Sequence, residues 1–101
     1  MTKAVWKFLI PMGEVGDQFE VKMPRGAEIL HVAEMPDTVR PLHLALWALV
    51  DGDADQVSRG LIVHGTGHPA DDVEEAEFIG TVVLTRTRLP LVFHFWDRGE
   101  L

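Results

Sequence analysis

Hydrophobic and polar residues alternate with a period of two along much of the chain. The alternation is clearest where Phe19, Val21 and Met23 share one face and the positions between them are polar. This pattern is typical of a β-strand with one buried face. Turn residues separate seven strand-like segments, at residues 6–10, 18–23, 27–34, 42–50, 59–64, 78–84 and 91–96.

The connections between these segments favour antiparallel pairing. Residues 11–17 predict a hairpin loop between the first two strands. Strand-like segments at spacings of about 10 to 15 residues, with turn residues between them, indicate a sandwich or a barrel. We therefore predict an all-β fold, a small antiparallel β-sandwich or barrel of about six to seven strands, which forms one domain over residues 1–101.

Residues 42–50 are the ambiguous segment, because they are apolar throughout except at His43. Leu and Ala favour a helix, and Pro41 suits the start of one. The run is short, however, and it lies among strand-like neighbours and ends at the turn residues Asp51 and Gly52. We therefore favour a strand.

Length and composition narrow the class of protein. A chain of 101 residues forms one modest core, and 47% apolar residues is too high for a disordered chain. The absence of cysteine excludes disulfides, thiolate metal sites and cysteine nucleophiles. The longest apolar run is too short to span a membrane, and no segment has the pattern of a signal peptide. We expect a protein of the cytoplasm of the cell that makes it, with no membrane partner.

The charge is strongly negative, with 9 basic and 16 acidic residues and a net charge of −7. This balance argues against direct binding to nucleic acid, which relies on clustered Lys and Arg. Eight of the acidic residues lie in two predicted loops, at residues 51–55 and 71–77. These loops flank the strand at residues 59–64, so they suggest an acidic face for a basic partner.

The segment from Gly65 to Pro69 is the most distinctive candidate site. Gly65 and Gly67 allow positive φ angles and the close approach of backbone N–H groups to an anion, but a tight turn requires the same glycines. His64 and His68 have the spacing of a helical metal pair, yet this Gly-rich segment is not helical in pattern. We predict no metal site and no cofactor.

Catalytic chemistry has little support in the sequence. Ser58 is the only serine, no nucleophile motif surrounds it, and no carboxylate pair lies in a context that would raise a pKa. The three tryptophans are expected to fill the core, with Trp96 partly exposed. The candidate ligand- or partner-binding residues are His64, Thr66, Gly67, His68, Asp71, Asp72, Glu74, Glu75 and Trp96.

Six spaced motifs carry a family resemblance over nearly the whole chain, at residues 4–8, 23–30, 46–51, 65–69, 78–82 and 92–95. The series resembles a family of small uncharacterised proteins encoded mainly by bacteriophages, including phages of actinobacteria. That family has no established function, so the resemblance implies a phage origin and no particular chemistry.

Three hypotheses from different classes follow. The first is a non-enzymatic phage accessory protein that binds a host or phage protein through an acidic face or a strand edge. The second is a binder of a small, nucleotide-like anion that uses the turn from Gly65 to His68 with a neighbouring Trp. The third is a virion-associated homo-oligomer in which edge strands pair between subunits.

Overall fold

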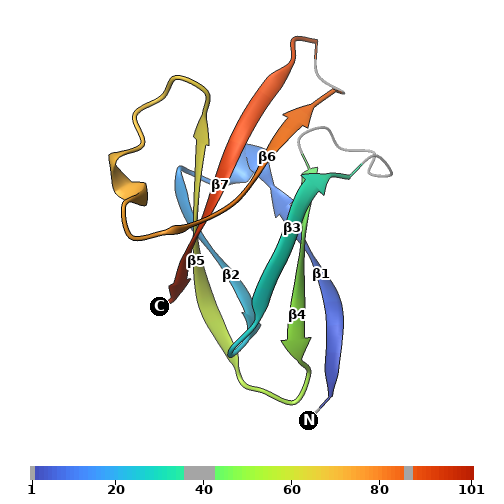
Figure 1. The fold of residues 1–101 in the computed structure, drawn as a ribbon. Helices are drawn as coiled ribbons and strands as arrows, with labels where there is room; N and C mark the ends of the chain where they lie inside the picture. The colour runs from blue at the N-terminus through green and yellow to red at the C-terminus, as the bar shows by residue number, and fades with distance from the viewer. Residues whose placement is uncertain (1, 36–42, 86–87) are drawn as a thin grey trace.

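The computed structural model describes residues 2–35, 43–85 and 88–101. Within these residues the regular structure consists of seven strands and two short 3-10 turns, with no α-helix (Figure 1). The elements are β1 (Lys3–Pro11), η1 (Met12–Glu14), β2 (Gln18–Pro24), β3 (Glu28–Glu34), β4 (His43–Asp51), β5 (Gln56–Gly65), η2 (Asp71–Val73), β6 (Glu77–Leu84) and β7 (Leu91–Glu100). The predicted all-β class is confirmed.

The strands form two antiparallel sheets that pack into a sandwich. One sheet has the order β1-β4-β3 and the other has the order β2-β5-β7-β6 (Figure 1). At one long side of the sandwich, the edge strands β3 and β6 pack against each other. At the other long side, the edge strands β1 and β2 make far fewer contacts with each other. We call these the β3/β6 side and the β1/β2 side.

The predicted hairpin at residues 11–17 is wrong. This segment contains η1 and carries the chain from one sheet to the other, so β1 pairs with β4 and β2 pairs with β5. Alternation identifies the buried face of a strand, but it does not say which other strand lies beside it. Both β1 and β2 are therefore edge strands.

The ambiguous segment is a strand, β4, from His43 onwards, and Leu42 lies outside the described residues. β4 is the central strand of its sheet. Leu44 and Leu46 are fully buried in the core, while Trp47 on the opposite face is half-buried between β1 and β3. Full burial of one face and partial burial of the other explain why the run is apolar except at His43.

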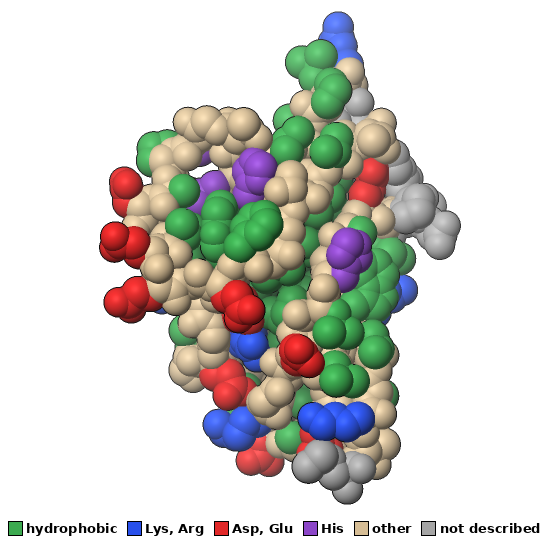
Figure 2. Space-filling model, viewed as in Figure 1, with side chains coloured by type: hydrophobic (Ala, Val, Ile, Leu, Met, Phe, Trp, Pro, Cys, Tyr) green, Lys and Arg blue, Asp and Glu red, His purple; other side chains and the backbone are tan. Residues whose placement is uncertain are grey.

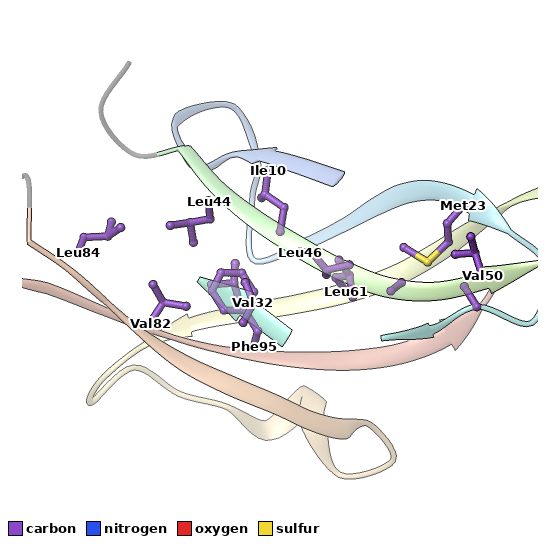
Figure 3. Close-up of a cluster of buried hydrophobic side chains, with 13 residues drawn as sticks. Ile10, Met23, Val32, Leu44, Leu46, Val50, Leu61, Val82, Leu84 and Phe95 are labelled. Carbon is purple, nitrogen blue, oxygen red and sulfur yellow. The ribbon is translucent and has the colours of Figure 1, made fainter. Parts of the chain in front are cut away.

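The hydrophobic core lies between the two sheets and draws on all seven described strands. Phe95 of β7 lies near its middle, with Val63 of the neighbouring strand β5 beside it and side chains of β4 contributed by the other sheet (Figure 3). The buried residues of this cluster are Ile10, Met23, Ala27, Val32, Leu44, Leu46, Ala48, Val50, Leu61, Val63, Val82, Leu84 and Phe95. Full burial of each large apolar side chain stabilises the fold by about 1.5–3 kcal/mol.

Candidate functional site

The outer face of the four-stranded sheet carries most of the predicted site. His64 of β5 lies directly opposite His94 of β7, and Ile62 lies opposite Trp96. Opposite residues in antiparallel strands share a face, and so do residues two apart in one strand. The four side chains therefore lie together on the face that points away from the core.

The β5–β6 loop, residues 66–76, folds back over this face and is held there by Asp72. Oδ1 of Asp72 accepts a hydrogen bond from Nε2 of His64 at 2.6 Å, and Oδ2 accepts one from Nε2 of Gln18 at 2.9 Å. Gln18 lies opposite Ile62, which is fully buried although it is on the outer face. Asp72 thus ties the loop across β5 to the edge strand β2.

The carboxylate of Asp72 is kept ionised by these contacts. The hydrogen bond from Gln18, followed by the one from His64, lowers the pKa of Asp72 from its ordinary value. His64 itself is buried and donates its Nε2 proton to the carboxylate, which can only accept when it is ionised. The pair is therefore a charge-assisted anchor for the loop.

His94 forms a second polar connection to the same loop. Its Nε2 lies 2.8 Å from Oγ1 of Thr66, and its Nδ1 lies 2.9 Å from Oγ1 of Thr81 in β6. A neutral imidazole donates through one nitrogen and accepts through the other, and a threonine hydroxyl serves either role. His94 therefore joins β6, β7 and the start of the loop.

Trp96 lies at the centre of the aromatic contacts on this face. Its ring centroid lies 5.8 Å from that of His64 and 6.4 Å from that of His94. Phe78 of β6 meets it edge-on at 5.6 Å, a favourable geometry for two aromatic rings. As predicted, Trp96 is partly exposed.

The prediction that the tryptophans fill the core is wrong: Trp6 is 37% exposed, and Trp47 and Trp96 are half-buried because they lie on the outer faces of their sheets. The core cluster of the described residues contains no tryptophan.

The predicted turn at residues 65–69 is present and depends on its two glycines. The amide of His68 donates to the carbonyl of Gly65 at 3.2 Å, and Gly67 has a φ of +87°. A Cβ at position 65 would lie 3.3 Å from Cε1 of His68, so the exposed imidazole packs over the glycine. Gly67 is required for its backbone conformation and Gly65 for this close approach.

The four acidic candidates differ in their contacts rather than in their exposure. All four are exposed and line a shallow hollow of about 320 Å³ together with Ala76 and Arg98, but only Asp72 hydrogen-bonds back to His64 and Gln18. Figure 2 shows acidic side chains along the outer edge of the loop and histidines beside it. Within residues 2–35, 43–85 and 88–101, the contacts between basic and acidic side chains are the Arg59–Asp97 ion pair and the imidazole–carboxylate contact of His64 with Asp72, so Asp71, Glu74 and Glu75 have no ion pair.

The chemistry of this face is that of a satisfied polar network. His64 and His94 already hydrogen-bond within the chain, and the Asp72 carboxylate occupies the position beside His64 that an anion would need. Across the described residues, no group of three His, Asp or Glu side chains is arranged to hold a metal ion. The contacts support a role in anchoring the loop.

Sequence reasoning missed an ion pair at the β3/β6 side. Arg59 donates to both carboxylate oxygens of Asp97, at 2.9 and 2.7 Å, and to the carbonyl of Ala27 at 2.7 Å. The two side chains are only 12% and 10% exposed and lie at a hollow of about 400 Å³. The hydrogen bond to Asp97 raises the pKa of Arg59. The available signal was alternation, which places Arg59 on the buried face with Leu61.

A second missed feature lies at the β1/β2 side. We call it the edge groove, a hollow of about 380 Å³ between the two edge strands, lined by Leu9, Ile10, Pro11, Val15, Phe19, Glu20, Val21 and Lys22. The groove could not be expected from the predicted hairpin, because a hairpin pairs β1 directly with β2 and leaves no groove between them. The actual topology leaves a strand edge on each side of the groove.

Comparison with known proteins identifies the family. The model of a domain of unknown function, DUF7352, matches residues 1–100. The chain belongs to the DUF7352 family. No curated protein and no solved structure was found to match it. In the described part of this DUF7352 chain, no helix is long and apolar enough to cross a membrane.

Proposed function

We propose that this DUF7352 protein is a non-enzymatic, phage-encoded accessory protein of the host cytoplasm that binds an extended segment of a host or phage protein. The segment adds as a strand to β1 and covers the edge groove. The observation that carries the proposal is the pair of unpaired strand edges on the two sides of an apolar hollow. The phage origin is supported by the six motifs that resemble phage-encoded proteins.

The backbone of β1 supports strand addition. β1 is nine residues long, pairs with β4 along its whole length, and is the last strand of its sheet. The N–H and C=O groups on its outer edge therefore have no strand partner within the described residues. An extended segment that pairs with them gains main-chain hydrogen bonds, which is the usual basis of β-augmentation.

The floor of the edge groove supports the same mode of binding. Ile10 is 1% exposed and closes the base of the groove, so the accessible apolar surface of the floor belongs to Phe19 and Val21, which are only partly buried where they pack against the core. Leu9 at the rim is 51% exposed. Alternate side chains of an added strand would reach this floor and bury apolar surface that the protein itself leaves accessible.

The two other surfaces receive weaker support. Asp71, Glu74 and Glu75 line a hollow with negative charge and little apolar contact area, and rim charges steer association more than they determine affinity. The turn at residues 65–69 is the candidate site for a small anion, but its neighbouring imidazoles are engaged within the chain. The strand edge combines backbone groups with apolar area, so we place the partner there.

Selection from a library of random linear peptides, followed by NMR mapping of the bound peptide, tests the proposal. We expect shifts in β1 and β2, and a loss of affinity of about tenfold or more in Leu9→Asp. Val83→Asp is the matched control, because Val83 is 50% exposed and lies on β6, an edge strand of the other sheet. Absence of binders, shifts confined to the β5–β6 loop, or equal losses in both variants would contradict the proposal.

A further inference from the structure

β1 differs in charge from the rest of the chain. It contains Lys3 and Lys7 and no acidic residue, although acidic residues outnumber basic ones by 16 to 9 in the whole sequence. The strand that we propose to bind a partner therefore carries a positive charge of its own on a negatively charged protein.

Register places these charges on one face of β1. Every second residue of β1 shares this face. In the pairing with β4, Lys3 lies opposite Asp51, Val5 opposite Leu49, Lys7 opposite Trp47 and Leu9 opposite Ala45. All four side chains thus occupy the outer face of the three-stranded sheet, where Val5 and Leu9 are 55% and 51% exposed. The other face of β1, which includes Phe8 and Ile10, points toward the core.

In residues 2–35, 43–85 and 88–101, neither lysine forms an ion pair. The contacts between basic and acidic side chains there are Arg59–Asp97 and the imidazole–carboxylate contact of His64 with Asp72. Lys7 faces Trp47 across the strand pair, and Oδ1 of Asp51, opposite Lys3, accepts the backbone amide of Asp53. Both ammonium groups are therefore available to a strand added on the open side of β1.

From this arrangement we infer that the occupant of the edge groove is an extended protein segment with two faces. This inference rests on the proposed function. On one face, two acidic residues four positions apart lie opposite Lys3 and Lys7. On the other face, apolar residues cover the groove beside Phe19 and Val21. Such a segment alternates apolar and polar positions and carries net negative charge.

The same charges disfavour a second copy of this chain as the occupant. Pairing β1 with β1 of another molecule brings four ammonium groups onto one strand pair and supplies no acidic partner. Like charges that face each other across strands are destabilising, and lysines on an edge strand are a common protection against self-pairing.

Three synthetic peptides test the inference against the complete chain. They share valines on the inward face and differ only at two outward positions four residues apart, which hold glutamate, glutamine or lysine. Fluorescence anisotropy of the labelled peptides measures affinity. We expect the glutamate peptide to bind roughly 3- to 30-fold more tightly than the glutamine peptide, with the lysine peptide weakest. The preference should shrink as salt screens the charges.

Charge reversal in the protein provides the second half of the experiment. The double variant Lys3→Glu with Lys7→Glu should prefer the lysine peptide. The matched control, Arg25→Glu with Arg88→Glu, changes net charge equally at exposed positions outside β1 and should keep the preference for glutamate.

Each further outcome separates the inference from the proposed function. Equal binding of all three peptides at β1 leaves the proposed function standing and overturns the inference. No binding by any peptide, together with a failed library selection, overturns both. If the control variant also loses the preference for the glutamate peptide, that preference reflects only the net charge of the protein, and the inference is overturned. A stable dimer in analytical ultracentrifugation, lost in Leu9→Asp, makes a second copy the occupant and overturns it too.

Discussion

The two long sides of the sandwich carry hollows of similar size but opposite character. The hollow at the β3/β6 side measures about 400 Å³ and contains the Arg59–Asp97 pair, whose groups hydrogen-bond to each other and to Ala27. The edge groove at the β1/β2 side measures about 380 Å³, has an apolar floor, and lies between two strand edges. Volume alone therefore does not separate a hollow whose polar groups are paired within the chain from one bordered by unpaired strand edges. Only the second kind has the features on which the proposed binding site rests.

The largest expected effect is at the β3/β6 side. Asp97→Ala leaves the guanidinium of Arg59 buried without its carboxylate, so we expect a loss of about 3–5 kcal/mol in the free energy of unfolding, measured with urea. The double variant Arg59→Met with Asp97→Leu should recover most of that loss, because it removes both charges. A loss below about 1 kcal/mol in the single variant would show that this side does not depend on the pair.

A smaller effect is expected from the anchor of the β5–β6 loop. Asp72→Ala removes the acceptor shared by Gln18 and buried His64, so the midpoint of thermal unfolding should fall by roughly 4 °C or more. Asp71→Ala is the matched control, since the neighbouring carboxylate is exposed and has no ion pair among the described residues. Hydrogen exchange should quicken at Ile62 and His64 in the Asp72 variant alone, and equal behaviour of the two variants would refute the anchor.

The same anchor predicts a pH dependence. The pKa of Asp72 is lower in the folded state, so the unfolded chain binds more protons as the pH approaches the ordinary aspartate value of about 3.9. The contribution of Asp72 to stability is present above that value and is lost as the pH falls through the folded-state pKa. The free energy of unfolding of the parent protein and of Asp72→Asn can be measured with urea at a series of pH values. The difference between the two should decrease as the pH falls below about 4. Parallel curves would contradict the assignment.

The smallest expected effect on stability is at the edge groove itself. Leu9→Gln and Val83→Gln change side chains of nearly equal exposure, and each should alter the free energy of unfolding by no more than about 0.5 kcal/mol. Only Leu9→Gln should weaken peptide binding. A large loss of stability in Leu9→Gln would mean that the side chains of the edge groove stabilise the fold. The edge groove would then not differ in this respect from the hollow at the β3/β6 side.

The sequence predicted the local structure better than the pairings. The alternation of Phe19, Val21 and Met23 identified the buried face of β2, because that information lies within a few neighbouring residues. The hairpin at residues 11–17 failed because the partner of β1 is β4, and nothing local distinguishes a turn within a sheet from a crossing between sheets.

The same limit applies to the candidate site. His64 and Thr66 were found because they surround a conspicuous glycine turn. Asp72 could not be separated from Asp71, since its role depends on Gln18, which lies 54 residues away in the chain. Arg59 was visible as a charged residue on an apolar face, but Asp97 was not, because the last strand was expected to end at Trp96 and in fact continues to Glu100.

The sheet-crossing connections also bear on how the chain folds as it is synthesised. Among the described strands, β1 and β3 pair with β4, and β2 pairs with β5, so none of the first three strands pairs with another of the three. During synthesis on the ribosome, the first three strands are made before their partners. Their apolar faces therefore stay exposed until the residues from 43 onward have been synthesised. Such non-local pairing slows folding and exposes nascent strands to wrong partners. The lysines of β1 would then protect the nascent chain during the interval before β4 arrives.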